Sequence, residues 1–447
     1  MKLFAADKKK TMQNEVVELG SLKVLSGIYA FFIISSIVMP QYFGVHIGVD
    51  ITCARASNLM FIAYMLINRK ILTHFLQTMC RCEILIPVCA YLFVAAYTMV
   101  FRVDINAFFL VFFEMFSLFM MIYGMRYVVG YKKAIKWIIG CAYFLGFYGL
   151  VEFVYGKSLF LQFLSTVPTA VRNCYRSGHY RVMGPCGHPL GYGLVLLLLL
   201  AIACVDTEKK EVFLFKRPIL LVVLLMNVFL TGSRSTLGLA ALEVLLIVIF
   251  SNRRNVLKSI FYIIATFLAL SIFLLLFFKT SIGQYILGQI ASVIDQVFDT
   301  SYATYFGVDV ATLQNSENYR KVLPKIFQLE WLNPWVGRGS KGFGGATVDG
   351  VFVHSVDNYY VVQYIKYAYP GFVSYILFIL ISVFVMIKEL VKRGSAIAKL
   401  LFIGVVMYYV NLWWVDALQT LKYVYIFIGV FYAEYLYSKD YKKLPQR

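Results

Sequence analysis

The segment NPWVGRGSKGFGG, residues 333–345, lies within the longest polar stretch of this chain, which runs from about Lys279 to Asn358. That stretch interrupts a sequence that is otherwise one apolar run after another. The small residues and turn formers of the segment let a backbone approach a ligand closely. We therefore expect the stretch 279–358 to be a lid, held on one side of a membrane by the apolar runs before and after it.

Composition excludes an ordinary soluble protein. The chain has 447 residues, of which 61% are hydrophobic and 15% charged, and its mean hydropathy is +0.75. One crossing of a bilayer takes about 20 mostly apolar residues. The sequence therefore predicts an all-α integral membrane protein with about twelve transmembrane helices. The candidate spans lie near 22–41, 48–67, 83–101, 105–125, 134–155, 189–205, 218–231, 235–250, 256–278, 360–387, 398–415 and 420–437.

These spans divide the chain into three parts. Residues 1–278 are expected to hold transmembrane helices one to nine, with an outer loop at 156–188. Residues 279–358 form the large extracytoplasmic loop, and residues 359–447 hold helices ten to twelve.

The net charge of +19 comes from lysines and arginines in alternate loops, at 8–10, 69–70, 132–136, 209–217, 253–258, 388–399 and 439–447. This is the positive-inside pattern, and it predicts that both termini are cytoplasmic. A solvated cytoplasmic fringe beside membrane lipid explains the excess charge, so no nucleic-acid partner is expected.

Ionisable residues inside the predicted spans cost about 2.5–3.5 kcal/mol each on insertion scales, so each needs a partner or a role. Asp50 and Arg55 lie on one span and are expected to form a structural ion pair. Glu114 and Glu243 either pair with an arginine or are protonated. Glu152 lies near the outer end of its span, closest to the expected site.

The eight cysteines do not form a disulfide framework in so large a membrane protein. Cys174 and Cys186 share the outer loop 156–188, so a disulfide between them is an alternative to two free thiols in an oxidising compartment.

Cations in the predicted outer loops need an explanation, because the positive-inside rule disfavours them there. Loop 156–188 carries Arg176, Arg181 and His188 among its basic residues and has no acidic residue. A phosphate-bearing substrate accounts for them, since guanidinium groups bind phosphate oxygens in pairs. Pairing with acidic residues of the long polar stretch is the alternative.

Arg234 lies in LTGSRSTLGL, residues 230–239, at the outer mouth of a tight helical hairpin. A cation held at a helix junction of a membrane protein is more often functional than incidental. We therefore place Arg234 in the substrate site.

The long polar stretch supplies further groups that can bind phosphate and sugar: Arg320, Arg338, His354, Asp357 and Asn358. The aromatic residues around them either stack on sugar rings or form an interfacial belt; they are Trp331, Trp335, Tyr359 and Tyr360. Because the sequence has no His/Cys/Asp group with metal-ligand spacing, we expect a site with no metal and no cofactor.

Four segments carry a family resemblance. RVMGPCGHPLGYG (181–193), LTGSRS (230–235), the run from NYR to NPWVGRG (318–339) and HSVDNYYVVQYIKYAYPG (354–371) occur in this order. Together they resemble the O-antigen ligase/polymerase superfamily, which comprises the Wzy-type polymerases and the lipid A-core ligases. The resemblance covers roughly residues 170–390; the first five spans are similar only in hydropathy and topology.

The resemblance implies a GT-C-like, metal-independent glycosyltransferase. Such enzymes transfer a glycan from undecaprenyl pyrophosphate in the outer leaflet to an acceptor hydroxyl. The substrate-binding arginines of the family fall on Arg181, Arg234 and Arg320, and its loop histidine on His354.

One departure from the family pattern bears on the reaction. Ligases of the family have a second histidine before the loop asparagine, and here that position is Asp357. The departure favours a polymerase of O-antigen, capsule or exopolysaccharide in a bacterial inner or plasma membrane. It leaves open whether His354 or Asp357 is the general base. His188 matches a family position to which no role is assigned here.

Two other functions stay open. A ligase would attach the glycan to a different acceptor. A polysaccharide transporter or flippase usually shows two similar halves, and this chain has no six-plus-six repeat. For a polymerase, the expected partners are the lipid-linked substrate and the chain-length regulator and flippase of the same pathway.

The charge pattern makes a direct prediction about topology. A reporter fused after Ser340 should be extracytoplasmic, whereas fusions near Lys133, Lys209 and Lys392 should be cytoplasmic. Paired phosphatase and fluorescent-protein reporters measure this, and a cytoplasmic signal at Ser340 would contradict the whole site assignment.

Overall fold

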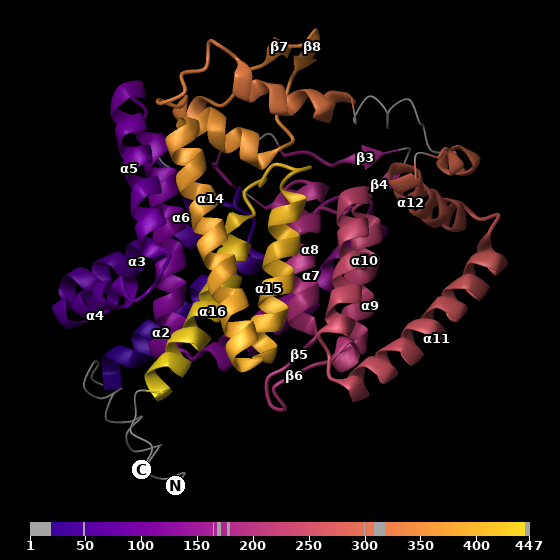
Figure 1. The fold of residues 1–447 in the computed structure, drawn as a ribbon, viewed down its shortest axis with the longest axis horizontal. Helices are drawn as coiled ribbons and strands as arrows, with labels where there is room; N and C mark the ends of the chain where they lie inside the picture. Colours follow the sequence, from indigo (N-terminus) through magenta and orange to yellow (C-terminus); the bar gives the residue numbers. More distant parts are fainter. Residues whose placement is uncertain are drawn as a thin grey trace.

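The computed structural model describes residues 19–47, 50–163, 165–167, 171–176, 179–298, 300–307 and 318–442. The N-terminus and the lysines at 8–10 lie outside these residues. Most of the described chain is helical (Figure 1). The helices are α2 (Leu19–Val38), α3 (Cys53–Ile67), α4 (Arg69–Cys80), α5 (Leu85–Arg102), α6 (Ile105–Tyr123), α7 (Tyr131–Tyr155), α8 (Pro189–Ala203), α9 (Pro218–Leu230), α10 (Arg234–Ile249), α11 (Arg253–Phe277), α12 (Ser281–Phe298), α14 (Tyr359–Arg393), α15 (Ala396–Asn411) and α16 (Leu421–Lys442).

The strands form short antiparallel hairpins in the connections between helices. The pairs are β1 (Gly44–His46) with β2 (Asp50–Thr52), β3 (Tyr175–Arg176) with β4 (His179–Tyr180), β5 (Val205–Asp206) with β6 (Glu211–Val212), and β7 (Ala346–Val348) with β8 (Val351–Val353). The hairpin β7–β8 lies at one end of the helix bundle, and β5–β6 lies at the opposite end (Figure 1).

Five of the described helices are long and apolar enough to cross a membrane: α5, α6 with the π-helical turn that follows it, α7, α11 and α14. The pair α3–α4 would add a sixth, although it is bent by 116° at its break. Shorter apolar helices, among them α8, α9 and α15, pack beside the long ones. The described part of the chain therefore has the build of an all-α membrane protein.

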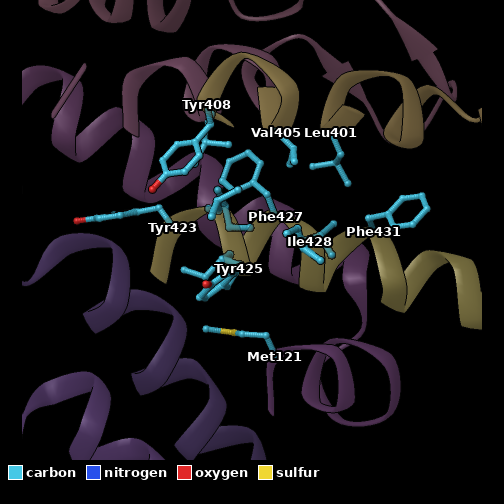
Figure 2. Packing of buried hydrophobic residues seen from close by; sticks show 14 of the residues in the cluster. Met121, Leu401, Val405, Tyr408, Tyr423, Tyr425, Phe427, Ile428 and Phe431 are labelled. Carbon is cyan, nitrogen blue, oxygen red and sulfur yellow. The ribbon is translucent and has the colours of Figure 1, made fainter. Parts of the chain in front are cut away.

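The core is centred on α8, α15 and α16, which are buried along most of their length. Figure 2 shows Tyr408 and Val405 of α15 together with Tyr425, Phe427 and Ile428 of α16. Small residues allow the helices to approach closely. A Cβ atom at Gly404 would lie 2.8 Å from Ala201 of α8, and one at Gly429 would lie 2.8 Å from Met121 of α6.

Two predicted spans differ from straight helices. In the span predicted at 48–67, residues 50–52 form the strand β2 and α3 follows it. The ion pair predicted between Asp50 and Arg55 is wrong: Asp50 pairs with His46 at 2.7 Å, and the Arg55 guanidinium donates to the Asp50 carbonyl oxygen at 2.7 Å. The register of β1 with β2 places His46 directly opposite Asp50.

The span predicted at 360–387 is interrupted within α14. Ala368 has φ 53° and ψ −167°, a conformation that lies outside the helical region, and Pro370 follows two residues later. The break leaves the Tyr369 amide free of the helix, and it donates to the carbonyl oxygen of Pro334 at 3.1 Å. The interruption therefore ties α14 to the segment 333–345.

Helix α11 stands apart from the rest of the bundle (Figure 1). Beyond Ser259, every side chain of this helix that the structure describes is exposed or half-exposed. Because these side chains are apolar around the whole helix, lipid is the environment that suits them.

The sequence suggested that the stretch 279–358 is one long loop, and here the structure differs. The stretch contains the 18-residue helix α12, and its later part, residues 318–358, is the segment we call the lid segment. Four contacts fasten the lid segment to the C-terminal end of α5 and to the start of α6. Tyr97 Oη donates to the Trp335 carbonyl oxygen at 2.7 Å, and Arg102 donates to the Gly337 and Val336 carbonyl oxygens at 2.7 and 3.0 Å. Asp104 accepts from the Ser340 amide at 2.7 Å.

The glycines of the lid segment serve its packing onto the bundle. A Cβ atom at Gly337 would overlap the carbonyl group of Lys366 in α14, and Gly339, at φ +69°, lies against Asp104. The close backbone approach that the sequence predicted toward a ligand is therefore, at these two positions, an approach to the protein itself.

We predict that Gly337→Ala loosens the lid segment. Overpacking costs about 1–3 kcal/mol, so proteolysis that passes through detachment of the segment should accelerate by roughly 5- to 150-fold. Limited proteolysis in detergent measures this. The matched controls are Gly27→Ala and Gly140→Ala, where an added Cβ meets nothing within 4 Å. Cleavage of Gly337→Ala at the wild-type rate would contradict the packing argument.

Candidate functional site: an arginine cluster at the lid end

The site is built around the hairpin β3–β4, which pairs Arg176 with His179 and is followed at once by Arg181. The Arg181 guanidinium donates to the Thr231 carbonyl oxygen at 2.7 Å and to the Gly232 carbonyl oxygen at 3.4 Å. These carbonyls belong to the turn between α9 and α10. Arg181 therefore joins the loop 156–188 to the turn that carries Arg234.

Glu152, near the end of α7, holds the chain on both sides of Arg181. It is fully buried, and its carboxyl oxygens accept from Tyr180 Oη at 2.6 Å, from the Met183 amide at 3.0 Å and from the Gly184 amide at 3.1 Å. Leaving one of these buried donors without its acceptor costs about 1–3 kcal/mol. The position of Arg181 is thus set by a buried carboxyl group from a different helix.

Three arginines meet at this place: Arg176, Arg181 and Arg320, which we call the arginine cluster. Burial, followed by the nearby charge of Arg320, lowers the pKa of Arg176. Burial, followed by the charge of Arg176, lowers the pKa of Arg181 to about 10. Among the described residues, no carboxylate contributes to either shift. The cluster is therefore a concentration of positive charge without a countercharge from the described chain.

Two further observations describe the surroundings of the cluster. The Nε atom of Arg320 is buried and has no hydrogen-bond partner within the described residues. Tyr285 of α12 lies beside both Arg176 and Arg181, and its ring packs on His179 with the ring centroids 4.9 Å apart. An anion that accepts from guanidinium nitrogens would satisfy the orphaned donor.

Arg234 is the first residue of α10, directly after Ser233, whose hydroxyl caps the helix by accepting from the Thr236 amide. The Arg234 residue also has an interaction partner within the protein. It shares the turn 231–235 with the carbonyl groups that hold Arg181, so the structure brings these two predicted residues to the same turn.

His188 lies at the start of α8, where its Nδ1 atom accepts from the Leu190 amide at 3.2 Å. Burial, together with the nearby charge of Arg181, lowers its pKa to about 4. Because the folded state favours neutral His188, its contribution to stability is present above about pH 6.5 and is lost as the pH falls toward 4. The structure thus gives His188 a capping contact beside the cluster.

His354 and Asp357 lie in the strip of chain that leads from β8 into α14. His354 is exposed, with its ring 4.6 Å from that of Phe352. Asp357 accepts from the Ser355 hydroxyl at 3.1 Å. Tyr319, which precedes Arg320 in the chain, donates to the Ser355 carbonyl oxygen and so ties this strip to the segment that carries Arg320.

Two predicted site residues have contacts within the protein. The Asn358 side chain caps α14 by accepting from the Tyr360 and Val361 amides. Arg338 donates to the Phe343 carbonyl oxygen at 2.8 Å, and its guanidinium lies 5.2 Å from the centroid of the Trp331 ring. Both contacts organise the lid segment, and any role of these residues in binding substrate stays a prediction.

Sequence reasoning missed two residues of this region. Tyr285 was placed in a loop, whereas α12 presents it to the arginines. Asp416 lies on the connection between α15 and α16; burial and the charge of Asp357 raise its pKa, against the effect of Lys366. An isolated acid in the apolar stretch LWWVDALQT, residues 412–420, was the available signal for Asp416.

Cys174 and Cys186 are both free thiols, so the disulfide considered for them is not formed. Among the residues that the structure describes, no group of three His, Cys, Asp or Glu side chains is arranged to hold a metal ion. Comparison of the chain with protein-family models gives no match, and comparison with curated proteins gives none either.

We predict that Glu152→Gln frees the chain around Arg181. A buried amide left without an acceptor costs about 1–3 kcal/mol, so hydrogen exchange in a peptide covering residues 180–186 should accelerate by about 5- to 150-fold. Tyr180→Phe removes one of the three donors and should have a smaller effect. Glu208→Gln, on the hairpin at the opposite end, is the control. Exchange in Glu152→Gln at the wild-type rate would show that Glu152 does not position Arg181.

Proposed function

We propose that this protein is a metal-independent glycan polymerase of a bacterial inner or plasma membrane. It transfers a glycan from undecaprenyl pyrophosphate to the end of another lipid-linked repeat unit on the outer face. The observation that carries the proposal is the arginine cluster, in which the hairpin β3–β4 and the lid segment bring three arginines together without a described carboxylate among them.

The cluster suits the leaving group of this reaction. A lipid pyrophosphate needs stabilisation of the negative charge that builds up as the glycosidic bond breaks. Guanidinium groups supply it through paired hydrogen bonds, and the unbonded Nε of Arg320 points to a bound oxygen acceptor. Half-buried positions strengthen these interactions because the local dielectric constant is lower than that of water.

The strip 354–357 suits the acceptor. His354 is exposed to solvent, and Asp357 lies three residues further on, beside Tyr319. Either side chain can accept the proton of a sugar hydroxyl within hydrogen-bond reach. Asp416 adds a second carboxyl group near Asp357.

The remaining part of the proposal concerns how the chain lies in the membrane. The chain crosses the membrane about twelve times in a GT-C-like arrangement, with the lid segment outside and both termini in the cytoplasm. The lysine-rich connections at the opposite end support this orientation, and so do the four sequence segments that resemble polymerases and ligases. A ligase and a flippase are the competing functions.

The arginine cluster makes the sharpest prediction. Arg176→Ala and Arg320→Ala should each lower kcat/KM for polymer formation by roughly 10- to 150-fold, the loss of one charged hydrogen bond worth about 1.5–3 kcal/mol. Lysine should rescue poorly, since one ammonium group cannot reproduce the guanidinium fork. Arg172→Ala is the matched control, because Arg172 is exposed in the same loop. Wild-type rates in both cluster variants would rule out the proposed site.

The assay uses purified protein with lipid-linked repeat units from host membranes, with and without excess EDTA. His354→Ala and Asp357→Ala should cost about 10²–10⁴-fold if either is the general base. Activity that EDTA abolishes and magnesium restores would overturn the metal-free mechanism.

Gene deletion then separates the three functions through gel analysis of surface glycans. Loss of long chains with single repeats retained indicates a polymerase. Lipid-linked polymer that is no longer transferred to a different acceptor indicates a ligase. Accumulation of lipid-linked units inside the cell indicates a flippase.

A further inference from the structure

A cavity of about 290 Å³ opens between the start of α7 and the β5–β6 hairpin, at the end of the bundle opposite the lid segment. It is lined by Lys132, Lys133, Lys136, Thr207 and Glu208. Three ammonium groups therefore face a single carboxylate.

The lysines are not neutralised by the surrounding protein. Within the described residues, none of the three ammonium groups makes a hydrogen bond or an ion pair; the Lys133 ammonium lies 5.1 Å from the centroid of the Trp137 ring. Their place in the helix adds to the imbalance. Each lies near the start of α7, which has no acidic residue in its first turn and no side-chain cap at Gly130. A cation at a helix N-terminus is disfavoured by about 0.3–1 kcal/mol.

The hairpin forms a firm second wall of the cavity. Its two other acids are already engaged. Asp206 accepts from the Lys216 ammonium at 2.5 Å and from the Glu208 and Lys209 amides at 3.0 and 3.1 Å, and Glu211 accepts from the Asn255 side-chain amide at 3.0 Å. Arg217 donates to the Ala203 and Val205 carbonyl oxygens, both at 2.8 Å, which holds the base of the hairpin to α8. Asp206 is thus not available to the lysines of α7.

The positive-inside rule explains why lysines lie at this end, but not why three of them line one cavity. The cavity also lies where the 25-residue helix α7 begins, so in a bilayer crossed by this helix the lipid head groups would lie beside it. Trp137, one turn into the helix, is the kind of residue that marks this interface.

We propose that this cavity is a binding site for a phosphate group, supplied by an anionic lipid of the adjacent leaflet or by a soluble phosphate. The three ammonium groups neutralise the phosphate oxygens. The start of α7 contributes its unpaired amides and the positive end of its dipole. The site is distinct from the arginine cluster and does not depend on the proposed reaction.

The experiment measures lipids and phosphate retained by the purified full-length protein. Native mass spectrometry is run in neutral detergent with added phosphatidylglycerol, with added phosphatidylcholine, and with added inorganic phosphate. The test variant is the triple change Lys132→Gln, Lys133→Gln, Lys136→Gln. The matched control is the triple change Lys388→Gln, Lys392→Gln, Lys399→Gln, which removes the same charge from another connection at this end.

We expect the wild type and the control to retain phosphatidylglycerol in preference to phosphatidylcholine. The test variant should retain at least tenfold less phosphatidylglycerol than the wild type. Retention of inorganic phosphate alone, lost in the test variant, supports the site with a soluble source. Equal retention in the wild type and the test variant, equal loss in the control, or no retention in any arm overturns the proposal. The triple change Lys132→Arg, Lys133→Arg, Lys136→Arg keeps the charge and should bind like the wild type, which separates an effect of lost charge from an effect of lost folding.

Discussion

The buried carboxyl group of Glu152 is the interaction on which the lid end of this protein depends. It reaches from α7 to three donors, two of which lie on opposite sides of Arg181. The helices beneath it are locked by other polar contacts: Asn227 of α9 donates to the Gly146 carbonyl oxygen at 2.8 Å, and Tyr192 of α8 donates to the Leu145 carbonyl oxygen at 2.8 Å. In an apolar environment few other groups compete for these hydrogen bonds. The helices α7, α8 and α9 and the loop 156–188 therefore keep fixed positions relative to one another.

That geometry maintains an arrangement that costs stability. Arg176, Arg181 and Arg320 share a half-buried region, in which burial and the repulsion of a neighbouring arginine disfavour the charges of Arg176 and Arg181. The carbonyl groups of the turn 231–232 offset part of this cost for Arg181, whereas the Nε atom of Arg320 stays unbonded within the described residues. Unmatched, desolvated charge is typical of functional sites, because a ligand of opposite charge recovers the cost on binding.

The lid segment reaches the same site through a different kind of contact. Tyr97 and Arg102 hold it by its peptide carbonyl oxygens, and Gly337 allows the backbone to touch that of Lys366. Tyr319 then joins the strip that carries His354 and Asp357 to the part of the chain that carries Arg320. Arg320 of the arginine cluster and the two residues proposed to act on the acceptor are therefore carried by one segment that is fastened at several points.

Helices with a continuous apolar run were predicted within a few residues. The run at 83–101 corresponds to α5, that at 134–155 to α7 and that at 256–278 to α11. The length of an apolar run can be read from the local sequence, and that length decides whether the run can cross a bilayer as a helix. The bend after Ile67, the break at Ala368 and the helix α12 were not predicted, because each depends on what packs against the chain or on a weaker, amphipathic pattern.

The sequence by itself determined that this is a helical membrane protein, that its lysines gather in alternate connections, and that the loop 156–188 carries cations without acids. It also contained Arg181, Arg234, Arg320, His354 and Asp357 as candidates. Only the tertiary structure decided that Arg176 completes the arginine cluster, that Glu152 is a clamp, and that Gly337 packs on the bundle. The physical reason is that a carbonyl group, a buried acid or a like charge acts across 28 to 235 residues of chain, and no local pattern records which of them will meet.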